Sequence, residues 1–114
     1  MTKKKNVQLY EGMYILSATL SEEARQKALD KILSGITSQG GEVHKIHEQG
    51  KKKLAYEIRG KREGYYYLLY FSVDASIISE LWYDYHLNED LIRFMTLNTD
   101  QVVEKLEFKP LVQA

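Results

Sequence analysis

The sequence contains no cysteine and a single proline, and its 16 basic residues are balanced by 16 acidic ones. Without cysteine there is no disulfide framework, no thiolate metal ligand and no cysteine nucleophile. With a formal net charge of zero, the chain is not a polycation that binds nucleic acid through its total charge. Any anionic partner must therefore be held by a local cluster of basic residues.

Long apolar runs are also missing. The stretch after Lys3, Lys4 and Lys5 could imitate the start of a signal peptide, but Glu11 and Gly12 interrupt it. No run approaches the roughly 20 apolar residues of a membrane span. We therefore expect a protein that is not exported, that lies in the cytoplasm and that has no membrane partner.

The first half of the chain predicts a strand, a helix and a second strand. A length of 114 residues and a hydrophobic content of 44% fit one folded domain. Residues 8–17 have the composition and alternation of a strand. Ser21 is a typical N-cap for a helix over residues 22–39, whose apolar residues recur at intervals of three and four. A second extended stretch covers residues 43–58, and Gly50 marks a bulge or bend in it.

The second half predicts a strand, a helix and a last strand. Residues 60–64 form a charged connection with a glycine at each end, and the aromatic residues 65–71 form the next strand. Asp74 caps a helix over residues 75–87, and residues 91–99 form the final strand. This order predicts an α+β ferredoxin-like sandwich, with a four-stranded antiparallel sheet in the order 2-3-1-4 and both helices on one face.

The pattern divides the chain into three parts. We expect a basic N-terminal arm over residues 1–8, the ferredoxin-like domain over residues 9–99 and a C-terminal tail over residues 100–114. Such a fold leaves the face of the sheet opposite the helices, its second or open face, bare.

Residues that could support catalysis are scarce. There is no G-x-S-x-G, phosphate-binding glycine loop or H-E-x-x-H motif. His44 and His47 are close in sequence, but an odd spacing on a strand sends their side chains to opposite faces, so they do not share a metal. Glu89 and Asp90 are adjacent acids in a turn, where carboxylates are usually solvated. We expect no enzyme, metal site, cofactor or small-molecule substrate.

Basic and acidic residues are separated along the chain. Residues 1–63 contain 13 basic and 8 acidic residues, whereas residues 64–114 contain 3 and 8. The basic residues at the N-terminus and around the second and third strands are Lys3, Lys4, Lys5, Lys45, Lys51, Lys52, Lys53, Arg59, Lys61 and Arg62. Such side chains either contact nucleic-acid phosphates or keep sheet edges from aggregating, and composition alone favours neither role.

Aromatic residues on the third strand raise an alternative function. Residues 63–70 resemble, in five of eight positions, a pattern found in RNA recognition motifs, whose aromatic side chains stack on single-stranded RNA. Stacking of that kind requires Tyr65 and Tyr67 on the open face of the sheet, because a strand alternates its side chains between two faces.

We expect the opposite register for this strand. It buries Tyr67, Leu69 and Phe71 against the helices and continues the apolar alternation to Val73. Three other residues then form an apolar surface on the open face that suits a protein partner: Tyr66, Leu68 and Tyr70.

Several segments of the chain resemble the bacterial small-subunit ribosomal protein six family, in matching order and spacing. These segments are Tyr10-Glu11, GKKKLAYEI over residues 50–58, Gly64-Tyr65-Tyr66 and LNEDLIRFM over residues 87–95. The chain departs from the family pattern at Glu57 and at residues 51–53. Glu57 stands where proline is usual, and residues 51–53 are lysines where arginines, which grip phosphate bidentately, are frequent.

The resemblance implies a non-catalytic structural component of the small ribosomal subunit with this same fold. It implies that the chain binds the central domain of the small-subunit ribosomal RNA together with ribosomal protein eighteen. Arg93 matches a family arginine and is the first candidate RNA contact. The further RNA candidates are Lys51, Lys52, Lys53, Lys3, Lys4 and Lys5. A basic partner protein would meet the acidic half of the chain at Glu89 and Asp90.

Overall fold

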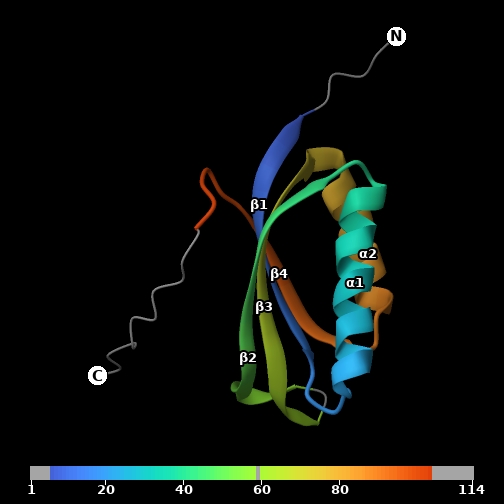
Figure 1. The fold of residues 1–114 in the computed structure, drawn as a ribbon, viewed down its shortest axis with the longest axis vertical. Coiled ribbons are helices and arrows are strands. Elements are labelled where there is room, and N and C mark those ends of the chain that lie inside the picture. Colours follow the sequence, from blue (N-terminus) through green and yellow to red (C-terminus); the bar gives the residue numbers. More distant parts are fainter. Residues whose placement is uncertain (1–5, 59, 104–114) are drawn as a thin grey trace, which may run out of the picture.

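The computed structural model describes residues 6–58 and 60–103. Its elements are β1 (Val7–Ser17), α1 (Glu22–Ser38), β2 (Glu42–Ile58), β3 (Lys61–Asp74), the 3-10 helix η1 (Ala75–Ile77), α2 (Ile78–Leu87) and β4 (Leu91–Asn98). The strands form one antiparallel sheet in the order β2-β3-β1-β4, and both helices cover the same face of it (Figure 1). The prediction of a ferredoxin-like α+β sandwich is confirmed.

Both predicted helix caps are present. The Ser21 hydroxyl accepts a hydrogen bond of 3.1 Å from the backbone N–H of Ala24 and so satisfies one free donor of the first turn of α1. The Asp74 carboxylate accepts one of 3.0 Å from the N–H of Ser76. This second cap begins η1 rather than an α-helix, so the predicted helix over residues 75–87 starts with one tighter turn.

The β2–β3 hairpin differs from the prediction at its tip. Residues 60–64 were expected to form a connection, but β3 already begins at Lys61, which pairs with Ile58. Gly60 has a φ of 77°, a left-handed conformation that glycine adopts without steric cost and that permits so early a return of the chain. The predicted bulge at Gly50 is confirmed by a φ of 82° and by a shift of register between Glu48 and Gly50.

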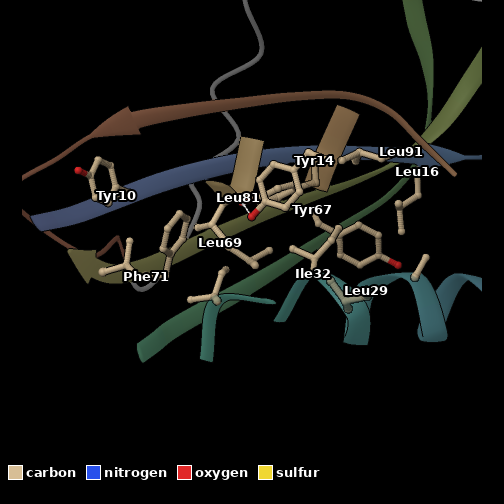
Figure 2. Packing of buried hydrophobic residues seen from close by; sticks show 14 residues of the cluster. Tyr10, Tyr14, Leu16, Leu29, Ile32, Tyr67, Leu69, Phe71, Leu81 and Leu91 are labelled. Carbon is tan, nitrogen blue, oxygen red and sulfur yellow. Dashed lines mark hydrogen bonds between the residues drawn. The ribbon is translucent and has the colours of Figure 1, made fainter. Parts of the chain in front are cut away.

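The core lies between the sheet and the two helices. Figure 2 shows Tyr14 and Tyr67 of the sheet together with Ile32 of α1. The fully buried side chains include Tyr14, Leu16, Ile36, Leu69, Phe71, Val73 and Leu81. The expected register of β3 is therefore confirmed, because Tyr67, Leu69 and Phe71 all belong to this cluster.

The second face of the sheet is covered at both ends, so the expectation of a bare face is wrong. At one end, residues 101–103 follow β4 back over the sheet, and the Nε2 atom of His47 lies 2.6 Å from the carbonyl oxygen of Val103. Figure 1 shows residues 99–103 on the side of the sheet away from the helices. At the other end, Tyr56 of β2 reaches Arg93 of β4. Ile15, the register partner of Arg93, is only 3% exposed.

Candidate nucleic-acid interface

Arg93 is exposed on the edge strand β4, as the family resemblance led us to expect. Its Nη1 atom donates a hydrogen bond of 2.5 Å to the hydroxyl of Tyr56, and its guanidinium carbon lies 5.8 Å from the centre of the Tyr56 ring. Within residues 6–58 and 60–103, no ion pair joins Arg93 to Glu89 or Asp90. The guanidinium is thus held at an aromatic ring rather than neutralised by a neighbouring carboxylate.

A second pair of a cation and an aromatic ring lies on the same face. The Lys52 ammonium stands 5.7 Å from the centre of the Tyr66 ring and donates a hydrogen bond of 3.2 Å to the side chain of Gln49. Tyr66 and Arg93 are both register partners of Ile15, one on each side of β1. The two pairs therefore form one row across the hairpin end of the sheet, which we call the cation–aromatic row: Lys52, Tyr66, Arg93 and Tyr56.

The three consecutive lysines are divided between the two faces. Lys51 pairs with Tyr65 and Lys52 pairs with Gly64, and paired residues of adjacent strands share a face. Lys52 accordingly lies on the face of Tyr66, while Lys51 and Lys53 project from the helix-covered side, where both are exposed. The structure thus brings Lys52 together with Arg93. Lys3, Lys4 and Lys5 lie outside the described residues.

The open-face residues of β3 are less accessible than predicted. Tyr66 is half-buried, but Leu68 is 9% exposed and Tyr70 only 1% exposed. The Tyr70 hydroxyl donates a hydrogen bond of 3.0 Å to Glu11, and burial together with this carboxylate raises the pKa of Tyr70 to about 12. The prediction that Leu68 and Tyr70 are open is wrong, because neighbouring side chains and the segment at Val103 cover this part of the sheet.

The turn between α2 and β4 is accessible. Glu89 and Asp90 are exposed, and the Asn88 side chain accepts a hydrogen bond of 3.0 Å from the N–H of Asp90. The turn therefore presents two carboxylates at the beginning of the edge strand.

The arrangement required for base stacking by Tyr65 and Tyr67 is not realised. Tyr67 is 5% exposed in the core, and Tyr65 packs against that core with the Arg25 guanidinium 4.0 Å from its ring centre. Both rings point towards α1, so this version of the RNA recognition motif hypothesis is wrong.

Sequence reasoning did not single out Tyr56, whose side chain is 60% exposed. The sequence does contain a hint of its role. Tyr56 lies an even number of residues after Lys52 in a basic hairpin, so strand alternation places both side chains on one face. What the alternation does not reveal is that this part of β2 reaches across β3 and β1 to the far edge strand.

Other kinds of site find little support in the described part of the chain. None of its helices has the length and apolar character needed to cross a membrane. Over the same residues, no three histidine or acidic side chains gather closely enough to hold a metal ion.

The fold is a ferredoxin-like sandwich, and its notable surface feature is a row of cations and aromatic rings. These features are those of a binding or structural domain. Residues 9–98 match the family model of ribosomal protein S6. Small ribosomal subunit protein bS6 of Chlamydia pneumoniae is 69% identical over 111 residues, covering 97% of this chain and 98% of the relative. The bS6 protein of Protochlamydia amoebophila is 68% identical over 103 residues, covering 90% of each.

A solved structure gives the same result. The crystal structure of 30S ribosomal protein S6 from Thermotoga maritima has a TM-score of 0.78 and 29% sequence identity, covering 82% of this chain and 89% of that one. The chain belongs to the ribosomal protein S6 family. It is a structural component of the small ribosomal subunit, and membership in this non-enzymatic family confirms the prediction that it is not an enzyme.

Proposed function

We propose that this chain binds the central domain of the small-subunit ribosomal RNA together with ribosomal protein eighteen, in the bacterial cytoplasm. The observation that carries this proposal is the cation–aromatic row, in which Arg93 and Lys52 lie on one face of the sheet. Arginine and lysine at such positions supply the phosphate contacts that dominate RNA affinity. Lys51, Lys53 and the N-terminal Lys3, Lys4 and Lys5 add further basic charge to the same half of the sequence.

The charge distribution supports the need for a protein partner. The chain has no net charge, and its half from residue 64 onwards carries 8 acidic residues against 3 basic ones. At long range this acidic half repels phosphates nearly as strongly as the basic half attracts them. A basic partner that covers the acidic half removes this repulsion, and it adds positive charge of its own.

The exposed turn at Glu89 and Asp90 is the proposed contact for that partner. It leads into β4, where Met95 is 40% exposed and Leu97 is 53% exposed. Apolar area beside carboxylates is typical of a protein–protein contact. Of the other residues predicted to meet this partner, Leu68 and Tyr70 are buried, and Tyr66 lies in the cation–aromatic row.

Filter binding tests the proposal directly. An RNA fragment of the central domain is titrated with this chain, with ribosomal protein eighteen, and with both together. We expect measurable affinity only for the pair. Reversing two charges, Glu89→Lys with Asp90→Lys, should weaken the protein pair while the urea midpoint of the chain stays unchanged. Equal RNA affinity of the single chain and the pair would show that the partner is not required.

A further inference from the structure

We propose that Tyr56 and Tyr66 form a stacking site for unpaired RNA bases, with Arg93 and Lys52 as the cations beside them. The inference rests on the proposed binding of ribosomal RNA and goes beyond it, because it states which part of the nucleotide this end of the sheet recognises. Base stacking on aromatic rings tolerates any base but requires that the base is free of a duplex.

Tyr56 is accessible and held in place at the same time. Its side chain is 60% exposed, which is unusual for a large aromatic residue on a sheet. Its hydroxyl accepts the hydrogen bond from Arg93, so the ring is fixed at its edge and its faces are not used by that bond. A ring that is already oriented loses less conformational freedom when a base stacks on it.

The second ring lies close to the first pair. Tyr66 and Arg93 flank Ile15 on neighbouring strands, and strands are about 4.8 Å apart, so the two positions are separated by about 10 Å across the sheet. The Lys52 ammonium lies 5.7 Å from the centre of the Tyr66 ring, and the Arg93 guanidinium carbon lies 5.8 Å from the centre of the Tyr56 ring. The site therefore has two rings on one face, each with a cation that can contact the phosphate of a stacked nucleotide.

The chemistry favours RNA over a protein partner at this place. A positively charged groove lined with aromatic rings is the usual construction of sites for single-stranded nucleic acid. The acidic turn at Glu89 and Asp90 and the exposed Leu97 lie on either side of Arg93 along β4, so the surface proposed for the basic protein adjoins this site but contains neither aromatic ring. This stacking site also uses different rings from those of an RNA recognition motif, since Tyr65 and Tyr67 face the helices.

The test uses the full chain with ribosomal protein eighteen and the central-domain RNA fragment. Tyr56→Ala should lower the RNA affinity by roughly 5-fold to 100-fold, the range expected for loss of one stacked base. The salt dependence should stay unchanged, because no charge is removed. Tyr56→Phe keeps the ring and should bind close to wild type. Tyr83→Ala is the matched control, since Tyr83 is 66% exposed on α2 and lies outside the site.

Several outcomes would overturn the inference. Wild-type affinity of Tyr56→Ala would do so, and so would a Tyr56→Phe variant as weak as Tyr56→Ala, because the hydroxyl bond alone would then matter. Loss of affinity for the partner protein in the absence of RNA would assign Tyr56 to the protein interface. If the wild-type pair does not bind the RNA at all, the proposed function itself fails. If Lys52→Ala lowers affinity and Tyr56→Ala does not, only the stacking inference fails.

Discussion

The Nε2 atom of His47 lies 2.6 Å from the carbonyl oxygen of Val103, and this bond joins the residues after β4 to the strand at the opposite edge of the sheet. Because a carbonyl oxygen only accepts hydrogen bonds, His47 must carry its proton on Nε2 here. The same ring meets Tyr70 edge-on, with ring centres 6.0 Å apart. His47 and Tyr70 therefore both contact Val103, where the chain returns over the open face.

Replacing His47 should weaken the attachment of residues 101–103 to the sheet. In His47→Ala, amide hydrogen exchange at Val102 and Val103 should accelerate by about 5-fold, corresponding to loss of roughly 1 kcal/mol of local stability. His44→Ala is the matched control, because His44 lies on the same strand but bonds to the Ser72 hydroxyl at 2.6 Å. Equal exchange in both variants would show that other contacts, such as the hydrogen bond of Tyr70 with the Val103 backbone, hold the segment without His47.

The register of β3 predicts where a tyrosine matters for stability. Tyr67→Ala removes a side chain that is 5% exposed in the core and should cost about 3 to 5 kcal/mol in the free energy of unfolding. Tyr83→Ala removes one that is 66% exposed and should change stability by less than about 0.5 kcal/mol. Urea denaturation measures both, and comparable losses would contradict the register described above.

Two glycines should respond to alanine with opposite signs. A methyl group at Gly64 would meet the Ile15 side chain and would lie 3.1 Å from the carbonyl oxygen of Leu16. Gly64→Ala should therefore destabilise the protein by roughly 1 to 3 kcal/mol. At Gly35, inside α1, a methyl group would find nothing within 4 Å. Gly35→Ala should stabilise by about 0.5 to 1 kcal/mol, and the two thermal midpoints should move in opposite directions.

Stability should fall in alkaline solution because of buried tyrosines. The hydroxyls of Tyr14 and Tyr85 are 2.9 Å apart, and burial raises the pKa of Tyr85 to about 12 and that of Tyr14 well above 10.0. Unfolded tyrosines ionise near pH 10, so the unfolded chain releases these protons first. The contribution is complete below pH 10 and is lost as the pH rises towards 12.

The variant Tyr85→Phe isolates this effect from other groups that titrate in the same range. It removes one of the two buried hydroxyls, so its free energy of unfolding should decline less steeply between pH 10 and pH 12 than that of the wild type. Urea denaturation at a series of pH values gives the comparison. Identical slopes would show that Tyr85 does not take part in the alkaline loss of stability.

The split of the lysine triplet predicts unequal roles in RNA binding. Each phosphate contact adds about −0.7 to −0.9 to the slope of log affinity against log salt. Lys52→Ala should flatten the slope of the protein pair by about that amount. Replacing Lys51 and Lys53 together should change it less, because both project from the helix-covered side. A larger change for the double variant would place the RNA at the other face of the hairpin.

Much of the fold was predictable because helix caps and strand alternation depend on residues that are close together in the sequence. Ser21 and Asp74 cap helices through side chains that bond within three residues, so a short window of sequence reveals them. The alternation of Tyr67, Leu69 and Phe71 indicates one buried face, and the burial confirms it. The tip of the hairpin was less predictable, because charged residues at 61–63 resemble a loop although they pair with β2.

The sequence by itself determined the fold class, the order of the strands, the buried face of β3 and, through its resemblance to a family, Arg93 as a candidate contact. Only the tertiary structure decided what covers the second face of the sheet. His47 with Val103 and Tyr56 with Arg93 are joined across 56 and 37 positions of the chain. Alternation and propensity report the neighbours along one strand, whereas these contacts depend on how far strands and segments reach across the completed sheet.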